Sequence, residues 1–107
     1  MVTRAVIVEF HAGVTAREIS DFAVSLRSLA AGTKNLVRMT CGEHYEMPSE
    51  SALGADAPAV TFGNFVSIWE FEDERALDGF LRQAVHGEMV RERFRQVVRK
   101  RYVANIR

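Results

Sequence analysis

The sequence lacks the features that mark secreted, membrane-spanning and nucleic-acid-binding proteins. Its single cysteine, Cys41, cannot form a disulfide within the chain. No apolar run approaches the roughly 20 residues that a transmembrane helix needs. The 14 basic and 14 acidic side chains cancel, so the overall charge favours neither nucleic acid nor an anionic membrane. We therefore expect a protein of a reducing compartment, most simply the cytoplasm, with no nucleic-acid or membrane partner.

The chain has two prolines and no linker rich in glycine, serine and proline, which predicts one domain, residues 1–107. A domain this small leaves much of its surface hard to bury, so a partner copy is expected. The pattern predicts strands at 2–11, 35–45, 64–72 and 101–106, and a helix that starts at Thr15, which has capping-box spacing with Glu18, and stops at Gly32. A long loop is predicted at 46–61, and such loops often form a lid or part of an interface. A second helix is predicted to start at Asp73 with Leu77, Phe80 and Leu81 on its inner face, break near Ala84 and continue through Met89, Phe94, Val97 and Val98.

Side-chain alternation in the strands predicts which residues share a face. The first strand places Val6, Val8 and Phe10 opposite Ala5 and Ile7. The second places Val37, Met39 and Cys41 opposite Leu36, Arg38 and Thr40, and the third places Phe65, Ser67, Trp69 and Phe71 opposite Val66 and Ile68. In the first and third strands both faces are apolar, so both faces of the sheet need a cover.

The order of elements predicts an α+β, ferredoxin-like βαββαβ fold, with a four-stranded antiparallel sheet and helices on one face. The helices leave apolar side chains on the other face, namely Ala5, Ile7, Val66, Ile68 and Val103. That much exposed apolar surface is unusual for a soluble monomer. A homodimer packed sheet to sheet would cover it, and a lipid-like ligand or another protein is the alternative.

Three segments carry a resemblance to a known family: RAVIVEF at the start, FVSIWEFEDERALDGFL in the third strand and second helix, and AVHGEMV after it. They resemble the stress-responsive alpha-beta barrel (Dabb) family, whose members are small homodimers of two ferredoxin-like protomers. The most specific part is the strand end EFED with its acidic helix start, followed by Phe80 and His86. The resemblance covers nearly the whole chain and implies a stress-associated homodimer within the dimeric alpha-beta barrel superfamily.

One plant branch of the family contains a polyketide cyclase, in which the histidine matching His86 acts as a base. That histidine is paired with a tyrosine six residues earlier, where this sequence has Phe80. Histidines on the first and third strands of the cyclase correspond to Arg4 and Phe65. Only His86 remains, so the same cyclization is not expected here.

The apolar residues of the inner faces could line a ligand cavity between helices and sheet, with Arg4 and His86 as its polar points. The candidate lining residues are Val6, Val8, Phe22, Leu26, Met39, Phe65, Trp69, Phe80, Leu81 and Met89. Residues of this kind at helical and strand spacing also form plain core, which is the more common outcome.

Two functions follow from these alternatives. The first is a homodimer that binds a small apolar or aromatic molecule without catalysis. The second is a cofactor-independent enzyme, polyketide-cyclase-like or monooxygenase-like, with His86 as base and Arg4 holding an anionic or enolate oxygen. Neither needs a cofactor.

Other residues that could carry chemistry support no further site. The first two strands are expected to run antiparallel, so His11 and His44 should lie toward opposite ends of the sheet and could share a metal ion only across a dimer. Cys41 has no second cysteine near it and is expected to be a small buried hydrophobe. The cluster Arg91, Arg93, Arg95, Arg99, Lys100 and Arg101 is interrupted by Glu92 and is expected to be a solvated surface.

Overall fold

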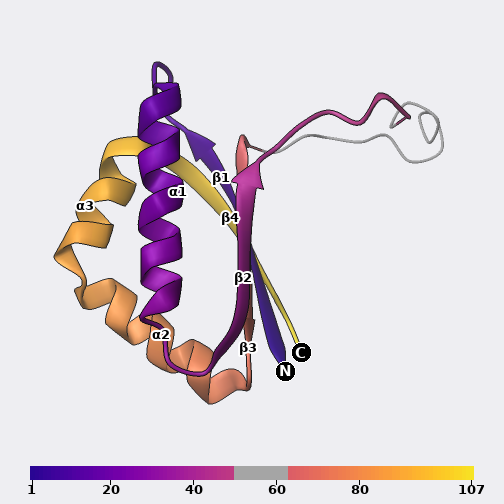
Figure 1. Cartoon of the computed structure of the whole chain (residues 1–107), viewed down its shortest axis with the longest axis vertical. Coiled ribbons are helices and arrows are strands. Elements are labelled where there is room, and N and C mark those ends of the chain that lie inside the picture. The colour runs from indigo at the N-terminus through magenta and orange to yellow at the C-terminus, as the bar shows by residue number, and fades with distance from the viewer. Residues whose placement is uncertain (50–62) are drawn as a thin grey trace.

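The structure, a computed structural model, describes residues 1–49 and 63–107, with the backbone alone for residues 84–86 and 88–90. Its sheet has four strands in the order β2-β3-β1-β4, and every neighbouring pair is antiparallel (Figure 1). The elements are β1 Val2–Phe10, α1 Ala16–Ala31, β2 Leu36–Glu43, β3 Phe65–Phe71, α2 Glu74–His86, α3 Glu88–Val97 and β4 Val98–Ile106. This is the predicted ferredoxin-like order, with the second helical region divided in two.

The two central strands, β1 and β3, show strict alternation between buried and partly exposed residues. In the antiparallel register Val6 lies opposite Ser67 and Val8 opposite Phe65, so these residues share a face. That face is buried under the helices, and the predicted division of faces in both strands is confirmed. Two-residue periodicity is reliable here because each strand has a neighbour on both sides and no bulge between them.

The edge strands differ from the predictions. A register shift between Leu36 and Arg38 leaves Val37 57 % exposed, while Leu36 packs against the core. The prediction that Val37 shares a face with Met39 was therefore wrong, because a bulge adds a residue to the alternation. On the other edge, Val103 lies opposite Val6 and so belongs to the helix side. Its predicted place on the uncovered face was wrong.

The second helical region also ends earlier than predicted. Gly87 separates α2 from α3, three residues after the predicted break near Ala84. Val98 is the first residue of β4, not part of the helix. Strand β4 is longer than the predicted 101–106 because residues 98–100 pair with the end of β1, where a further register shift occurs after Glu9.

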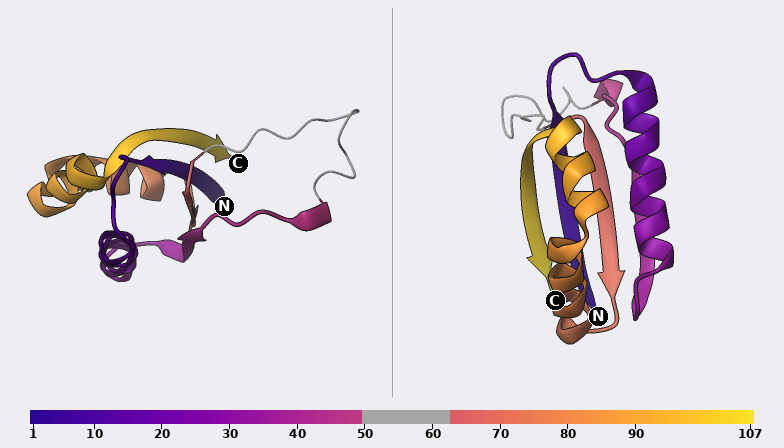
Figure 2. Two further views of the ribbon diagram at one scale, coloured as in Figure 1. Left: turned by 90° about the horizontal axis from the view of Figure 1, so that it is seen from above. Right: turned by 90° about the vertical axis from the view of Figure 1, so that its left-hand side faces the viewer.

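All three helices lie on one side of the sheet (Figure 1). Helix α1 lies over the β2 side, and α2 and α3 lie over the β1 side, with β4 left at the edge (Figure 2). The opposite face of the sheet has no helix over it within the described residues. Side chains there, such as Ala5, Ile7, Val66 and Ile68, are partly exposed. No helix in the described part of the chain is long and apolar enough to cross a membrane.

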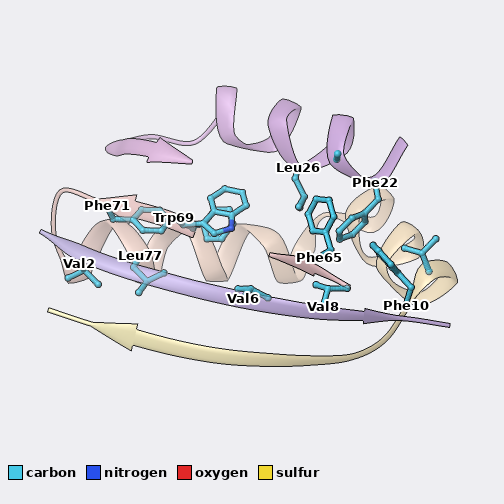
Figure 3. Packing of buried hydrophobic residues seen from close by; sticks show 13 residues of the cluster. Val2, Val6, Val8, Phe10, Phe22, Leu26, Phe65, Trp69, Phe71 and Leu77 are labelled. Atoms are coloured by element: carbon cyan, nitrogen blue, oxygen red, sulfur yellow. The ribbon is translucent and has the colours of Figure 1, made fainter. Parts of the chain in front are cut away.

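The core lies between the helices and the covered face of the sheet (Figure 3). Phe22 of α1 contacts the rings of Phe10, Phe65 and Phe94 at centroid distances of 5.6, 5.3 and 5.1 Å. Phe80 of α2 lies 4.9 Å from Trp69 between ring centroids. These aromatic contacts fix α1 and α2 against the two central strands, since edge-on and tilted ring pairs stabilise beyond the area they bury.

The predicted loop at 46–61, with its expected role as a lid or interface, lies mostly outside the described residues. The residues that flank it are held together: the His44 amide donates to Asn64 O at 2.8 Å. The Asn64 amide donates in turn to Val8 O at 2.7 Å. This chain of bonds ties the end of β2 to the start of β3 and to β1.

Helix α1 begins with the predicted capping box. The Thr15 hydroxyl accepts from the Glu18 amide at 3.1 Å, and a Glu18 carboxylate oxygen accepts from the Thr15 amide at 3.0 Å. The hydrogen bonds from the Thr15 backbone and then its hydroxyl lower the pKa of Glu18. This pKa shift means that the stabilisation is complete above the ordinary glutamate pKa and is lost as the pH falls through the lowered value.

We expect Thr15→Ala to lower the free energy of unfolding by about 1 kcal/mol, because an amide of the first turn loses its acceptor. Urea denaturation at pH 7 measures the loss. The pKa of Glu18, followed by NMR, should rise toward its ordinary value in the variant. Ser20→Ala, an exposed change within the same helix, is the control and should not destabilise. Equal effects of the two changes would rule out the cap as the cause.

Candidate ligand-binding site

A cavity of about 80 Å³ lies between the sheet and the helices. Residues of β1, β3, α1 and α2 that the sequence suggested as ligand contacts come together around it: Arg4, Val6, Val8, Phe22, Leu26, Trp69, Phe80 and Leu81. The structure adds four lining residues that the sequence did not suggest, Leu29, Ser67, Phe94 and Arg101. The described part of the lining is apolar except for two guanidinium groups, one hydroxyl and the Trp69 indole N–H.

Of the other predicted site residues, two lie outside this lining and two have side chains outside the described residues. Phe65 is only 1 % exposed and belongs to the packed core. Met39 lies on β2, partly buried against that core, and does not reach the cavity. His86 and Met89 lie in α2 and α3, and their side chains are outside the described residues. Their proposed contacts with a ligand stay predictions.

Arg4 lies in the middle of the sheet, between β3 and β4, and is 7 % exposed. Its Nη1 donates to Asn105 Oδ1 of β4 at 3.1 Å. Burial, and after it the charge of Arg101, lowers the pKa of the Arg4 guanidinium. A guanidinium nevertheless stays protonated in proteins, so Arg4 puts a positive charge beside the cavity.

Ser67 and Trp69 supply the other polar contact in the lining. The Trp69 indole Nε1 donates to Ser67 Oγ at 2.9 Å, and both side chains are buried. Among the described residues, the Ser67 hydroxyl accepts this bond and donates none, so its hydrogen can point to a ligand. Ser67 could have been found from the sequence, because its strand alternation places it between two inward-facing aromatic residues.

The cavity is small compared with sites for drug-sized ligands, which are roughly 300–1,000 Å³. It is also smaller than an engineered cavity of about 150 Å³ that holds benzene. The residues around it are therefore mostly close-packed core, as the more common interpretation of the sequence expected. The remaining space admits a molecule of a few carbon atoms, and a larger one would displace Phe80, Leu81 or Phe94.

His11 and His44 lie at the same end of the sheet, contrary to the prediction. Strands β1 and β2 both pair antiparallel with β3, so they run parallel to each other and end on the same side. Both histidines line a separate open depression of about 470 Å³ with Asn64 and Glu43. No cluster of three or more His, Cys, Asp or Glu among the described residues could hold a metal ion.

Cys41 lies on β2, partly buried and packed against the core. Burial raises the pKa of its thiol, and the charge of Arg27 opposes this shift less strongly. A raised pKa lowers the thiolate fraction, so Cys41 is less reactive than an exposed cysteine. This agrees with the expected role of a small apolar residue on a strand.

The basic cluster is divided by the change from α3 to β4. Arg95 pairs with Glu92 at 3.4 Å, and Arg99 pairs with Glu9 at 2.6 Å. Arg101 is exposed in part but also lines the cavity, a role that the sequence did not suggest. Alternation along β4 places Arg101 on the same face as Val103, but only the pairing of β4 with β1 shows that this is the helix side.

The sequence matches the family model described as the Stress responsive A/B Barrel Domain over residues 2–107. No curated protein matches it. An Arabidopsis thaliana protein has a similar structure, with a TM-score of 0.77 and 14 % identity, covering 100 % of this chain and 94 % of that one.

Two bacterial structures are also similar. A dimeric ferredoxin-like protein of unknown function from Thermobifida fusca has a TM-score of 0.72 and 13 % identity, covering 98 % of this chain and 88 % of the other. SnoaB, a cofactor-independent oxygenase from Streptomyces nogalater, has a TM-score of 0.62 and 15 % identity, covering 99 % and 90 %. At these identities the likeness shows the fold alone.

Proposed function

Because the chain belongs to the stress-responsive alpha-beta barrel (Dabb) family, we propose that it is a homodimer that binds a small apolar or aromatic molecule between its helices and its sheet. The observation that carries the proposal is the cavity beside Trp69, with Arg4 and Ser67 as its buried polar groups. A few directing groups in an apolar lining are typical of small-molecule sites.

The homodimer is supported by the composition of the uncovered sheet face. Ile7, Val66 and Ile68 are adjacent there, with Tyr102 of β4 beside Ile7. A second copy of the same face would cover these residues, since symmetric interfaces are self-complementary. The similar protein from Thermobifida fusca is described as dimeric, which agrees with this arrangement.

We expect butyramide, a small neutral molecule, to shift the NMR signal of the Trp69 indole N–H saturably at millimolar concentration. Trp69 is the one tryptophan of the sequence and lines the cavity, so its signal reports the site. Leu81→Phe should abolish the shift because the larger ring fills the space. Val24→Phe, an exposed position on α1, is the matched control and should bind as the wild type does. An unmoved indole signal with all small probes would exclude binding in this cavity.

Catalysis is the second candidate function, and it is favoured because the helix that carries His86 also contributes residues to the cavity. Phe80 and Leu81 line the cavity, and the same helix ends at His86. The similar Streptomyces protein is a cofactor-independent oxygenase, so this fold can carry such chemistry. Phe80 replaces the tyrosine of the plant cyclase and lacks its hydroxyl, so the same cyclization is not expected. If the protein is an enzyme, His86→Ala should abolish turnover of its substrate. The binding of butyramide should remain in this variant.

A further inference from the structure

Arg4 is a buried charge that has no acidic partner in the described part of the chain. It is 7 % exposed, and none of the ion pairs among the described residues includes it. A guanidinium has five N–H donors. One of them bonds to Asn105. Because an unpaired charge is costly to bury, an anion in the adjacent cavity would stabilise this arrangement.

The strand register places two more donors, Ser67 and Arg101, on the same face of the sheet as Arg4. Val6 lies opposite Ser67 on one side and Val103 on the other. Arg4 is two residues before Val6, and Arg101 is two residues before Val103 on the antiparallel strand. The two guanidinium groups therefore flank the level at which the Ser67 hydroxyl lies, and all three side chains line the cavity.

The remaining lining residues fit a carbon chain and not a second charge. Val6, Leu26, Trp69, Phe80 and Leu81 contribute apolar surface. No described lining residue is acidic, so nothing described in the cavity competes for the two guanidinium groups. The described lining is thus positive where β1 and β4 adjoin and is otherwise mostly apolar.

We infer that the ligand is a small monocarboxylate, whose carboxylate lies between Arg4 and Arg101 and whose apolar chain lies against Trp69 and Phe80. The inference rests on the proposed binding function and adds the class of ligand. A carboxylate matches the paired donors of a guanidinium, which favours this anion over a point-like one. A volume of about 80 Å³ suits an aliphatic acid of a few carbon atoms.

The test compares butyrate with butyramide, which have nearly the same shape but differ in charge. Isothermal titration calorimetry at pH 7 should show butyrate binding at least about tenfold more tightly, because hydrogen bonds to charged groups are the stronger ones. Equal affinities of the wild-type protein for the two compounds would overturn the inference.

Variants that neutralise one charge identify the residues that cause the preference for butyrate over butyramide. Arg4→Gln should reduce the affinity for butyrate to that for butyramide, and Arg101→Gln should remove part of the preference. Arg82→Gln makes the same change in net charge at an exposed position of α2, outside the lining, and should leave both affinities unchanged. An unaltered preference in Arg4→Gln would contradict the assignment.

These experiments distinguish a failure of the carboxylate assignment from a failure of the proposed binding function. If butyramide moves the Trp69 indole signal but butyrate binds no more tightly, the cavity binds ligands and only the carboxylate assignment fails. If no small probe, charged or neutral, moves that signal, the binding function fails as well. Should Arg4→Gln not fold, the wild-type comparison and the exposed Arg101→Gln variant still decide the question.

Discussion

We expect Ile68→Asp to convert the proposed dimer to a monomer at micromolar concentration. Ile68 lies in a central strand on the sheet face that no described helix covers. A symmetric interface would bury the new carboxylate twice, each time without a partner, and an unpaired buried charge costs several kcal/mol. Static light scattering should show a mass of 12.0 kDa for the variant and twice that for the wild type.

The distribution of charge on this face agrees with an interface centred on Ile68. The Arg38 and Glu70 pair lies at one end of the apolar band, at a distance of 2.6 Å, and Glu9 lies near the other. Apolar residues in the middle with charges at the margin are the usual arrangement of interfaces. Stable ones bury on the order of 1,600 Å² in total.

The matched control for this prediction is Val24→Asp. Val24 is 58 % exposed on α1, and α1 lies on the side of the sheet opposite the open face. It receives the same change from an apolar side chain to a carboxylate and should leave the mass unchanged. A wild-type protein that scatters as a 12.0 kDa monomer would refute the sheet-to-sheet dimer.

Phe22→Ala will lower the free energy of unfolding by about 3–5 kcal/mol. The Phe22 side chain is 1 % exposed and is the point at which α1 meets rings from β1, β3 and α3. Removing it leaves a cavity that close-packed neighbours cannot fill. Since domains have a total stability of roughly 5–15 kcal/mol, the variant is expected to be partly unfolded at 37 °C.

Urea denaturation at one fixed protein concentration measures this loss, because the stability of the proposed dimer would depend on concentration. Tyr45→Ala is the control: Tyr45 is an aromatic residue that is 73 % exposed, and its removal should change stability little. A loss below about 1 kcal/mol for Phe22→Ala would mean that α1 is not anchored by this aromatic cluster.

The sequence predicted most of the local structure because its signals there are local. The capping pair Thr15 and Glu18 fixed the start of α1, and the alternation of β1 and β3 divided their residues between the two faces correctly. Apolar residues at helical spacing gave the inner surface of α2, where Leu77 and Phe80 are buried. These patterns depend only on residues near in sequence.

The errors arose where a residue's place depends on a distant strand. Val37 was misplaced by a bulge in the pairing of β2 with β3, and Val103 by the register of β4 with β1. His11 and His44 were separated because the first two strands were taken as antiparallel, whereas both pair antiparallel with β3 and so run parallel to each other. Nothing in the local pattern reveals which strands adjoin.

The candidate site likewise combines residues that local patterns predicted with residues whose place depends on distant strands. Its apolar residues were predicted from periodicity, but Arg101 reaches the cavity only because β4 returns beside β1. Phe65 and Met39 were placed in the lining because they share the inner face, yet packing directs Phe65 into the core and leaves Met39 on the β2 side. A shared face does not decide which side chains border a space of about 80 Å³.

A crystal structure of the protein grown with butyrate tests the binding of a small molecule between helices and sheet most directly. We expect one butyrate in each protomer, with its chain beside Trp69 and Phe80, and two protomers packed through their open sheet faces. A cavity that stays empty at a butyrate concentration well above the measured dissociation constant, with the ligand bound elsewhere, would contradict the proposed site.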